Sequence, residues 1–158
     1  MDIPRIFTIS ESEHRIHNPF TPEKYATLGR VLRMKPGARI LDLGSGSGEM
    51  LCTWARDHGI NGTGIDMSQL FTAQAKQRAE ELCVSERVHF IHSDAAGYVT
   101  DEKCDVAACV GATWIAGGFA GSVELLAKSL KPGGMILIGE PYWRQVPATE
   151  EIAQACGV

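Results

Sequence analysis

The residues best suited to chemistry in this sequence are three aspartates and a glycine-rich loop. Asp42 closes an apolar run and is followed by residues 44–48, Gly-Ser-Gly-Ser-Gly. Because glycines carry no side chain, the backbone N–H and C=O groups of such a loop can contact a ligand. Asp66 and Asp94 each follow a later apolar run. The pattern predicts one ligand site built from a loop and several carboxylates.

The spacing of the glycines narrows the class of ligand. A dinucleotide-binding loop has the pattern G-x-G-x-x-G and places a pyrophosphate at the N-terminus of the following helix. Here the third glycine, Gly48, comes one residue early, and Glu49 occupies the place of the last glycine. We therefore expect a nucleoside-type ligand without a pyrophosphate.

Each candidate residue has a physical task toward such a ligand. Asp66 can accept hydrogen bonds from two vicinal hydroxyls of a ribose. Asp94 can accept one from an exocyclic amine such as that of adenine, and Ala95 leaves room for a base. Met67 is apolar and polarizable, which suits contact with a flat ring. A single aspartate at a strand end is commonly a helix cap or a turn residue, so the inference depends on the whole set.

These residues are positioned by an alternation of predicted strands and helices. We predict strands over residues 39–43, 60–66, 88–92, 105–110 and 135–139, the last after a turn at 131–134. Helices are predicted from Thr21-Pro22, over 49–58 and 68–83, along a stripe of Phe119, Val123, Leu126 and Leu130, and from Thr149 to Gly157. Such alternation predicts an α/β fold with a doubly wound, mainly parallel sheet and helices on both faces. In such sheets ligands bind beyond the carboxyl ends of the strands, where the three aspartates fall.

Composition excludes several function classes. The 158 residues suit one α/β domain over residues 35–158, preceded by an N-terminal arm and helix over 1–34. A net charge of −4 without a basic run disfavours nucleic acid as a partner. No apolar stretch approaches the roughly 20 residues that span a bilayer, so no membrane partner is expected. Five cysteines without a C-x-x-C pair predict reduced thiols in a cytoplasmic protein, and no cluster predicts a metal site.

The order of these motifs resembles that of the class I S-adenosylmethionine (SAM)-dependent methyltransferases. Residues 40–48 resemble the first motif of that family, residues 64–68 the second, and residues 92–95 its adenine-binding segment. Residues 130–134 are similar to its turn before the fifth strand. The similarity covers about residues 35–140 and is greatest to small-molecule enzymes of the quinone-biosynthesis and cyclopropane-fatty-acid-synthase type, which are often bacterial.

The resemblance implies SAM as the cofactor and a small molecule as the methyl acceptor. The implied cofactor-binding residues are Asp42, Gly44, Ser45, Gly46, Gly48, Asp66, Met67, Asp94, Ala95 and Val110. Among them, Asp42 is expected to organise the loop, and the N-terminal arm is expected to close over the cofactor. No catalytic residue is assigned, because Glu140, Tyr142, His14 and His17 are all possible general bases.

The tryptophans and the number of strands leave further points open. Trp54 is predicted in the core and Trp114 near the site, whereas Tyr142 and Trp143 fit either a substrate wall or packing. The family sheet has seven strands and five are predicted here, so a domain truncated at its C-terminus is expected. An exposed sheet edge would favour a homo-oligomer. Two other functions stay open: a non-catalytic SAM-binding or interaction module, and a nicotinamide-dependent oxidoreductase, against which the glycine spacing argues.

Overall fold

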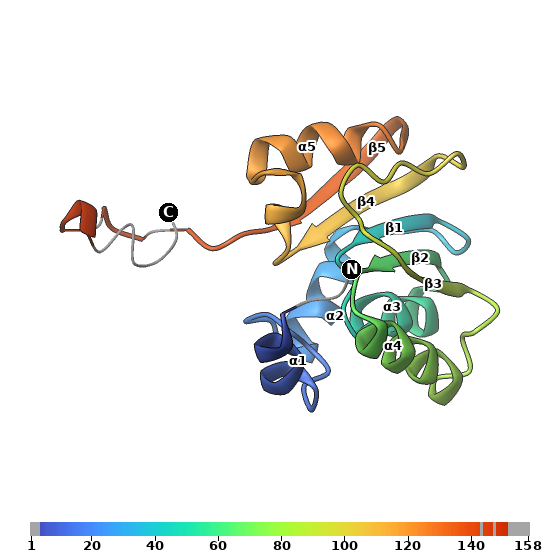
Figure 1. Ribbon diagram of the computed structural model, residues 1–158. Helices are drawn as coiled ribbons and strands as arrows, with labels where there is room; N and C mark the ends of the chain where they lie inside the picture. Colours follow the sequence, from blue (N-terminus) through green and yellow to red (C-terminus); the bar gives the residue numbers. More distant parts are fainter. Residues whose placement is uncertain (1–3, 143, 147, 152–158) are drawn as a thin grey trace.

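The centre of the molecule is a five-stranded, all-parallel sheet in the order β3-β2-β1-β4-β5 (Figure 1). The computed structural model describes residues 4–142, 144–146 and 148–151. The strands are β1 (Arg39–Leu43), β2 (Asn61–Asp66), β3 (Val88–His92), β4 (Cys104–Val110) and β5 (Leu130–Gly139). The helices are α1 (Arg5–Glu11), α2 (Pro22–Val31), α3 (Glu49–His58), α4 (Gln69–Glu81), the 3₁₀-helix η1 (Thr113–Ala116) and α5 (Phe119–Ala127). The predicted α/β class with a parallel sheet is confirmed.

The strand order reverses between β1 and β4. The chain adds β2 and β3 on one side of β1 and then returns to its other side for β4 and β5. Ile40 accordingly pairs with Gly62 of β2 and with Val106 of β4. Connections that leave in opposite directions open a crevice at the carboxyl ends of the two central strands, where open α/β sheets bind ligands.

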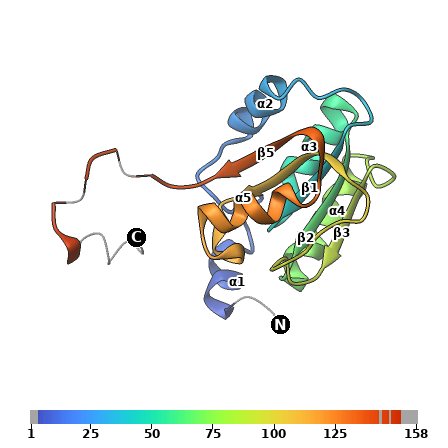
Figure 2. The ribbon, with the colours of Figure 1, turned by 90° about the horizontal axis from the view of Figure 1, so that it is seen from above.

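Helices cover both faces of the sheet, with α3 and α4 on one face and α5 on the other (Figures 1 and 2). Side chains alternate between the two faces along each strand. Ile40 therefore packs in the cluster that contains the α3 and α4 side chains, whereas Leu41 packs with Leu125 and Leu126 of α5. No described helix has the length and apolar character needed to cross a membrane.

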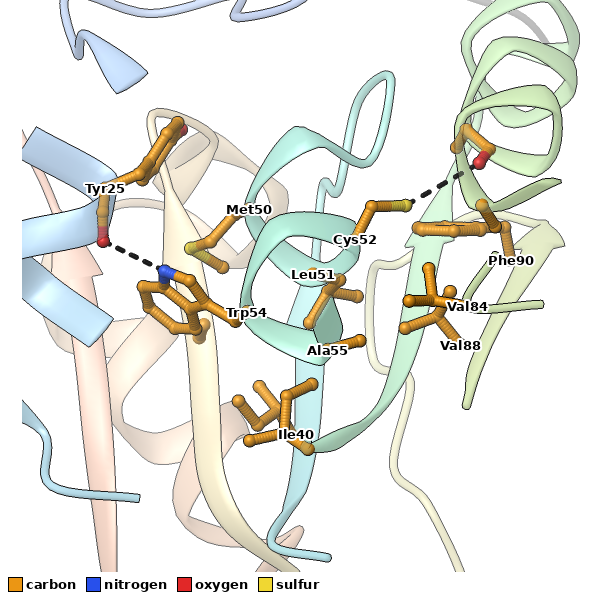
Figure 3. Close-up of a cluster of buried hydrophobic side chains, with 14 of the residues drawn as sticks. Tyr25, Ile40, Met50, Leu51, Cys52, Trp54, Ala55, Val84, Val88 and Phe90 are labelled. Carbon is orange, nitrogen blue, oxygen red and sulfur yellow. Dashed lines mark hydrogen bonds between the residues drawn. The ribbon is translucent and has the colours of Figure 1, made fainter. Parts of the chain in front are cut away.

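The core on the α3 face also attaches α2 to the rest of the domain. Trp54 of α3 is 1% exposed, and its Nε1–H donates to the backbone oxygen of Tyr25 at 2.9 Å (Figure 3). Met50 and Leu51 of the same helix are buried beside it. The predicted core position of Trp54 is confirmed, and the contact holds α2 close to the helix that follows the glycine loop.

Local signals place the helix ends as predicted. The Thr21 side chain accepts a hydrogen bond from Lys24 N at the start of α2, where Pro22 is the first residue. The Ser68 side chain caps α4 by accepting from Phe71 N. Gly59 ends α3 in the left-handed conformation, which an L side chain rarely adopts.

The structure corrects the prediction around β5. Residues 131–134, predicted as a turn, lie within the strand, which begins at Leu130 rather than at Met135. The turn-forming residues produce an irregularity there, since Cys104 pairs with Leu130 but Val106 pairs with Met135. Leu130 is consequently not part of the preceding helix.

Smaller differences concern element ends, and one prediction cannot be compared. The helix α4 ends at Glu81 rather than near Cys83, and β4 begins at Cys104, one residue before the predicted start. Most of the helix predicted from Thr149 to Gly157 lies outside the described residues.

Candidate cofactor-binding site

A cavity of about 710 Å³ lies at the carboxyl ends of the central strands. Such a volume is within the range of small-molecule and cofactor sites. Nine of the ten residues predicted to bind the cofactor line it: Asp42, Gly44, Ser45, Gly46, Asp66, Met67, Asp94, Ala95 and Val110. The structure therefore brings together residues from four strand ends that are far apart in the sequence.

The first two glycines let the backbone of the loop lie close to the residues after β4 and to the N-terminal arm. Both have positive φ angles, +78° at Gly44 and +53° at Gly46. A Cβ atom on Gly44 would lie 2.6 Å from the Cβ of Ala112, which follows β4. A Cβ atom on Gly46 would lie 2.9 Å from Nδ1 of His17 in the N-terminal arm. Any larger residue would push the loop away from β4 or from the arm.

Gly48 has a different position from the other two glycines. It is not among the residues that line the cavity, and it precedes α3 with a φ of +73°. A Cβ atom there would lie 2.6 Å from the Phe90 ring and 2.8 Å from the Ala75 side chain. This glycine lets α3 start close to β3 and α4.

Asp66 connects the glycine loop to the end of β2. One carboxylate oxygen accepts a hydrogen bond from Gly46 N and the other accepts one from Ser68 N, both at 2.8 Å. The side chain is 9% exposed and lines the cavity. Because each carboxylate oxygen can accept more than one hydrogen bond, Asp66 retains capacity for ligand hydroxyls.

Asp42 is a buried acid with an unused acceptor. It is 4% exposed, and its Oδ1 atom has no hydrogen-bond partner among the described residues. The pKa of Asp42 is raised from 3.8 to about 7, chiefly by loss of solvation and in smaller part by the nearby Asp66 carboxylate. A buried acceptor without a partner is unfavourable, so a cation or a donor in the cavity would stabilise it.

The far end of the cavity is formed by residues that follow β2 and β3. Asp94 is exposed, and its Oδ1 accepts a hydrogen bond from Ala96 N at 2.8 Å. Ala95 beside it is buried. The backbone oxygen of Met67 is 2.9 Å from Nε2 of His92. These contacts fix the backbone around the position predicted for a base.

The N-terminal arm and α2 form one wall of the cavity, which the sequence predicts only as an arm that closes over the cofactor. The cavity-lining residues from this part of the chain are Pro4, Phe7, Glu11, Arg15, Ile16, His17, Asn18 and Tyr25. Asn18 Nδ2 donates to the Tyr25 hydroxyl at 2.9 Å and to the backbone oxygen of Val110 at 3.4 Å. Burial raises the pKa of Tyr25 to about 12, which keeps this hydroxyl protonated. Polar side chains in a segment without periodicity gave no signal for these contacts.

Only one of the four possible general bases lines the cavity. That residue is His17, whereas His14, Glu140 and Tyr142 are not among the lining residues. Glu140 accepts a hydrogen bond from the Thr113 hydroxyl, and Tyr142 is 81% exposed.

The remaining predictions near the site have mixed outcomes. Trp114 lies at the cavity and is 65% exposed, in agreement with its predicted place. Trp143 lies outside the described residues. Within the described part of the chain, no group of three or more His, Cys, Asp or Glu side chains is arranged to hold a metal ion.

Residues 40–134 match the family described as "Methyltransferase domain". The chain belongs to this methyltransferase family. The match covers both glycine-loop and strand-end motifs, and it confirms the resemblance to SAM-dependent methyltransferases that the sequence suggested.

Three relatives are similar over almost the whole chain. YjhP, an uncharacterised protein of Escherichia coli strain K12, is 90% identical over all 158 residues, which is 64% of its own length. A SAM-dependent methyltransferase from Geobacter sulfurreducens, crystallised with S-adenosylhomocysteine (SAH), is 77% identical, with a TM-score of 0.96 over 98% of this chain and 62% of that one. Another from Thiobacillus denitrificans, also with SAH, is 75% identical, with a TM-score of 0.95 over 99% of this chain and 63% of that one. The chain thus spans less than two thirds of the length of each relative.

Proposed function

We propose that this chain is the cofactor-binding part of a SAM-dependent methyltransferase and that SAM occupies the cavity at the carboxyl ends of the strands. The observation that carries the proposal is the similarity, at 75–77% identity, to two methyltransferases crystallised with SAH. The cavity supports it independently, because a glycine loop without side chains and an unpaired buried carboxyl suit a ligand with a nucleoside and a cationic centre.

The proposed contacts follow the predicted assignment. Asp66 accepts from the ribose hydroxyls, since its carboxylate lies in the cavity and is already oriented by two backbone N–H groups. Asp94 and Ala95 contact the adenine. The methionine part lies along the glycine loop towards Val110, where the Asp42 carboxyl can face its positive charge.

The chemistry needs little from acidic or basic side chains. Bound SAM supplies a methyl group that is activated by the positive charge on sulfur. The chain holds the donor in one orientation and excludes water through the arm, and such alignment can account for a large part of catalysis. A base is required only where the acceptor must lose a proton, and no residue is assigned that role.

The acceptor, location and assembly belong to the same proposal. We propose a small-molecule acceptor, because the cavity is lined by apolar side chains such as Phe7, Ile16 and Ile115 and the arm crosses it. A cytoplasmic location is the further expectation. Any homo-oligomer would form through the exposed Met135 and Ile136 of β5, the strand at one edge of the described sheet. Light scattering after gel filtration measures the oligomeric state.

Calorimetric titration tests the cofactor. We expect the wild-type chain to bind SAH and SAM but not NAD(P). Asp66→Ala should weaken SAH binding by about 10- to 100-fold, because hydrogen bonds to a charged group contribute about 1.5–3 kcal/mol. Asp101→Ala, which changes an exposed carboxylate outside the cavity, is the matched control. Absence of SAH binding by the wild type would refute the proposal, and binding without methyl transfer to a broad acceptor panel would indicate the non-catalytic alternative.

A further inference from the structure

One chain of hydrogen bonds joins the N-terminal arm (residues 4–20) to the glycine loop and to α4. Gln74 of α4 donates through Nε2 to the backbone oxygen of Ser12 at 2.8 Å. The Ser47 hydroxyl lies 3.0 Å from Oε1 of Gln74 and 2.9 Å from Nε2 of His17. The same Nε2 lies 2.9 Å from the backbone oxygen of His14. The chain therefore starts and ends on the arm and passes through two other elements.

The direction of each hydrogen bond in this chain is fixed by the groups at its ends. The Ser12 carbonyl can only accept, so the amide nitrogen of Gln74 faces it and Oε1 faces Ser47. The Ser47 hydroxyl then donates to Gln74, which leaves its oxygen free to accept from His17. Because a carbonyl also lies beside Nε2, the imidazole carries its proton on Nε2. In a neutral His17 the single Nε2–H is shared between the His14 carbonyl oxygen and the Ser47 hydroxyl oxygen, and Nδ1 is left as an acceptor.

The imidazole of His17 also fills space between the arm and the domain. Its ring centroid is 4.1 Å from that of Phe71 on α4. On the other side, Nδ1 lies where a side chain on Gly46 would have to be. Both neighbours line the cavity together with His17. The ring therefore contacts both α4 and the glycine loop from its place on the arm.

We propose that His17 is a positioning residue that, through Ser47 and Gln74, fastens the N-terminal arm over the cavity and so slows the release of the cofactor. The inference rests on the proposed function, because it takes SAM or SAH as the occupant. It goes beyond that function by naming the contact that controls how long the occupant stays. Gln74 is the informative partner, since it does not line the cavity and can be changed without removing a wall of the site.

The fastened arm should be sensitive to acid. Burial lowers the pKa of His17 below its ordinary value of 6.5. The hydrogen bond to the His14 backbone oxygen and the carboxylates of Glu11 on α1 and Asp66 on β2 act in the opposite direction, and the His14 ring lowers it slightly. A lowered pKa means that the open arm binds a proton more readily than the closed arm. The contribution of His17 to closure is therefore fully present above about pH 6.5 and is lost as the pH falls below that value.

The release rate of SAH, followed by stopped-flow displacement, tests the fastening. We expect His17→Ala and Gln74→Ala each to accelerate release about tenfold at pH 7.5, and the double variant to be no faster than either, because both break one chain. His14→Ala, which removes an exposed ring but keeps the backbone oxygen, should match the wild type. Unchanged release in Gln74→Ala, or additive effects in the double variant, would overturn the inference.

Hydrogen exchange in the free protein separates this inference from the proposed function. Amides of residues 5–18 should exchange faster in Gln74→Ala than in the wild type, while those of the sheet stay unchanged and show that the variant is folded. Equal exchange in the arm would refute the fastening whatever ligand binds. A wild type that binds no SAH would refute the proposed function. The exchange result would still decide whether the hydrogen bonds through Ser47 and Gln74 hold the arm in place.

A comparison of two histidines tests the acid dependence. When the pH is lowered from 7.5 to 5.5, release of SAH from the wild type should accelerate. His17→Gln, whose amide N–H can replace Nε2–H but cannot gain a charge, should release SAH at the wild-type rate at pH 7.5 with little change at pH 5.5. His89→Gln, which alters an exposed histidine of β3 that does not line the cavity, should keep the acceleration. Acceleration that persists in His17→Gln, or that disappears in His89→Gln, would refute the assignment of the acid dependence to His17.

Discussion

The buried carboxyl of Asp42 should make the stability of the free protein depend on pH in the opposite sense to most carboxylates. Its pKa is raised from 3.8 to about 7, chiefly by loss of solvation and further by Asp66. Between these two pH values the folded protein holds a proton that the unfolded chain has released. The free energy of unfolding must therefore fall as the pH rises through this window. Asp42→Asn cannot ionise and removes this contribution.

The size of the effect follows from the shift. A change of about three pKa units corresponds to about 4 kcal/mol at 1.36 kcal/mol per unit. Most of it develops between the two pKa values, so about 2.5 kcal/mol falls between pH 5 and pH 8. The asparagine amide has its own packing and hydrogen-bonding cost, but that cost does not vary with pH. The quantity to compare is thus the difference between variant and wild type as a function of pH.

Urea unfolding of the free protein at several pH values measures this difference. We expect the stability of Asp42→Asn relative to wild type to rise by about 2.5 kcal/mol from pH 5 to pH 8, with most of the rise complete near pH 7. Asp57→Asn is the control: Arg56 holds the pKa of Asp57 below its usual value, so its effect lies at lower pH. A flat difference for Asp42→Asn would show that this carboxyl is ionised in the folded protein, and the argument for an unpaired acid in the cavity would fail.

Three further predictions concern the same region. Gly48→Ala should destabilise the protein by about 2–4 kcal/mol in urea unfolding, because its positive φ and the nearby Phe90 ring leave no room for a methyl group. Arg78→Leu should cost about 3–5 kcal/mol, since it leaves the 8%-exposed Glu49 carboxylate without its 2.9 Å partner, and Glu49→Gln in the same chain should restore most of that loss. Binding of SAM at pH 6.5 should release a proton from Asp42, seen as a binding enthalpy that differs between phosphate and imidazole buffers.

Short-range signals in the sequence were sufficient to predict the helices and strands that surround the cavity. The caps at Thr21 and Ser68 depend on one side chain and a backbone group three residues later, so they can be recognised without the fold. The strand-end aspartates could be grouped because parallel strands share one carboxyl edge. The same rule could not assign Gly48, because the ring that occupies the space beside it belongs to Phe90, more than 40 residues along the chain.

The β5 strand shows how a tertiary contact can override turn chemistry. Pro132 and two glycines indicate a turn, and Gly133 does adopt a φ of +78°. The pairing of β5 with β4 shifts in register at this point, so the strand continues through the glycines. Lys131 forms an ion pair at 2.8 Å with Asp105 at the start of β4. The carboxylate of Asp105 also accepts a hydrogen bond from Arg39 N. One side chain thus holds the beginnings of three adjacent strands together, which no local pattern contains.

The arm is the part of the site that the sequence could least predict, and the reason is physical. Its fastening joins Ser47 to a histidine 30 residues away and Gln74 to a backbone oxygen 62 residues away. Serine and glutamine are typical of solvated surfaces and have no periodicity that would mark them as partners. They meet only because β1, β2 and the start of α4 bring the glycine loop and α4 to one edge of the sheet. The cofactor motifs can therefore be read from a short stretch, whereas the contact that closes the cavity exists only in the folded chain.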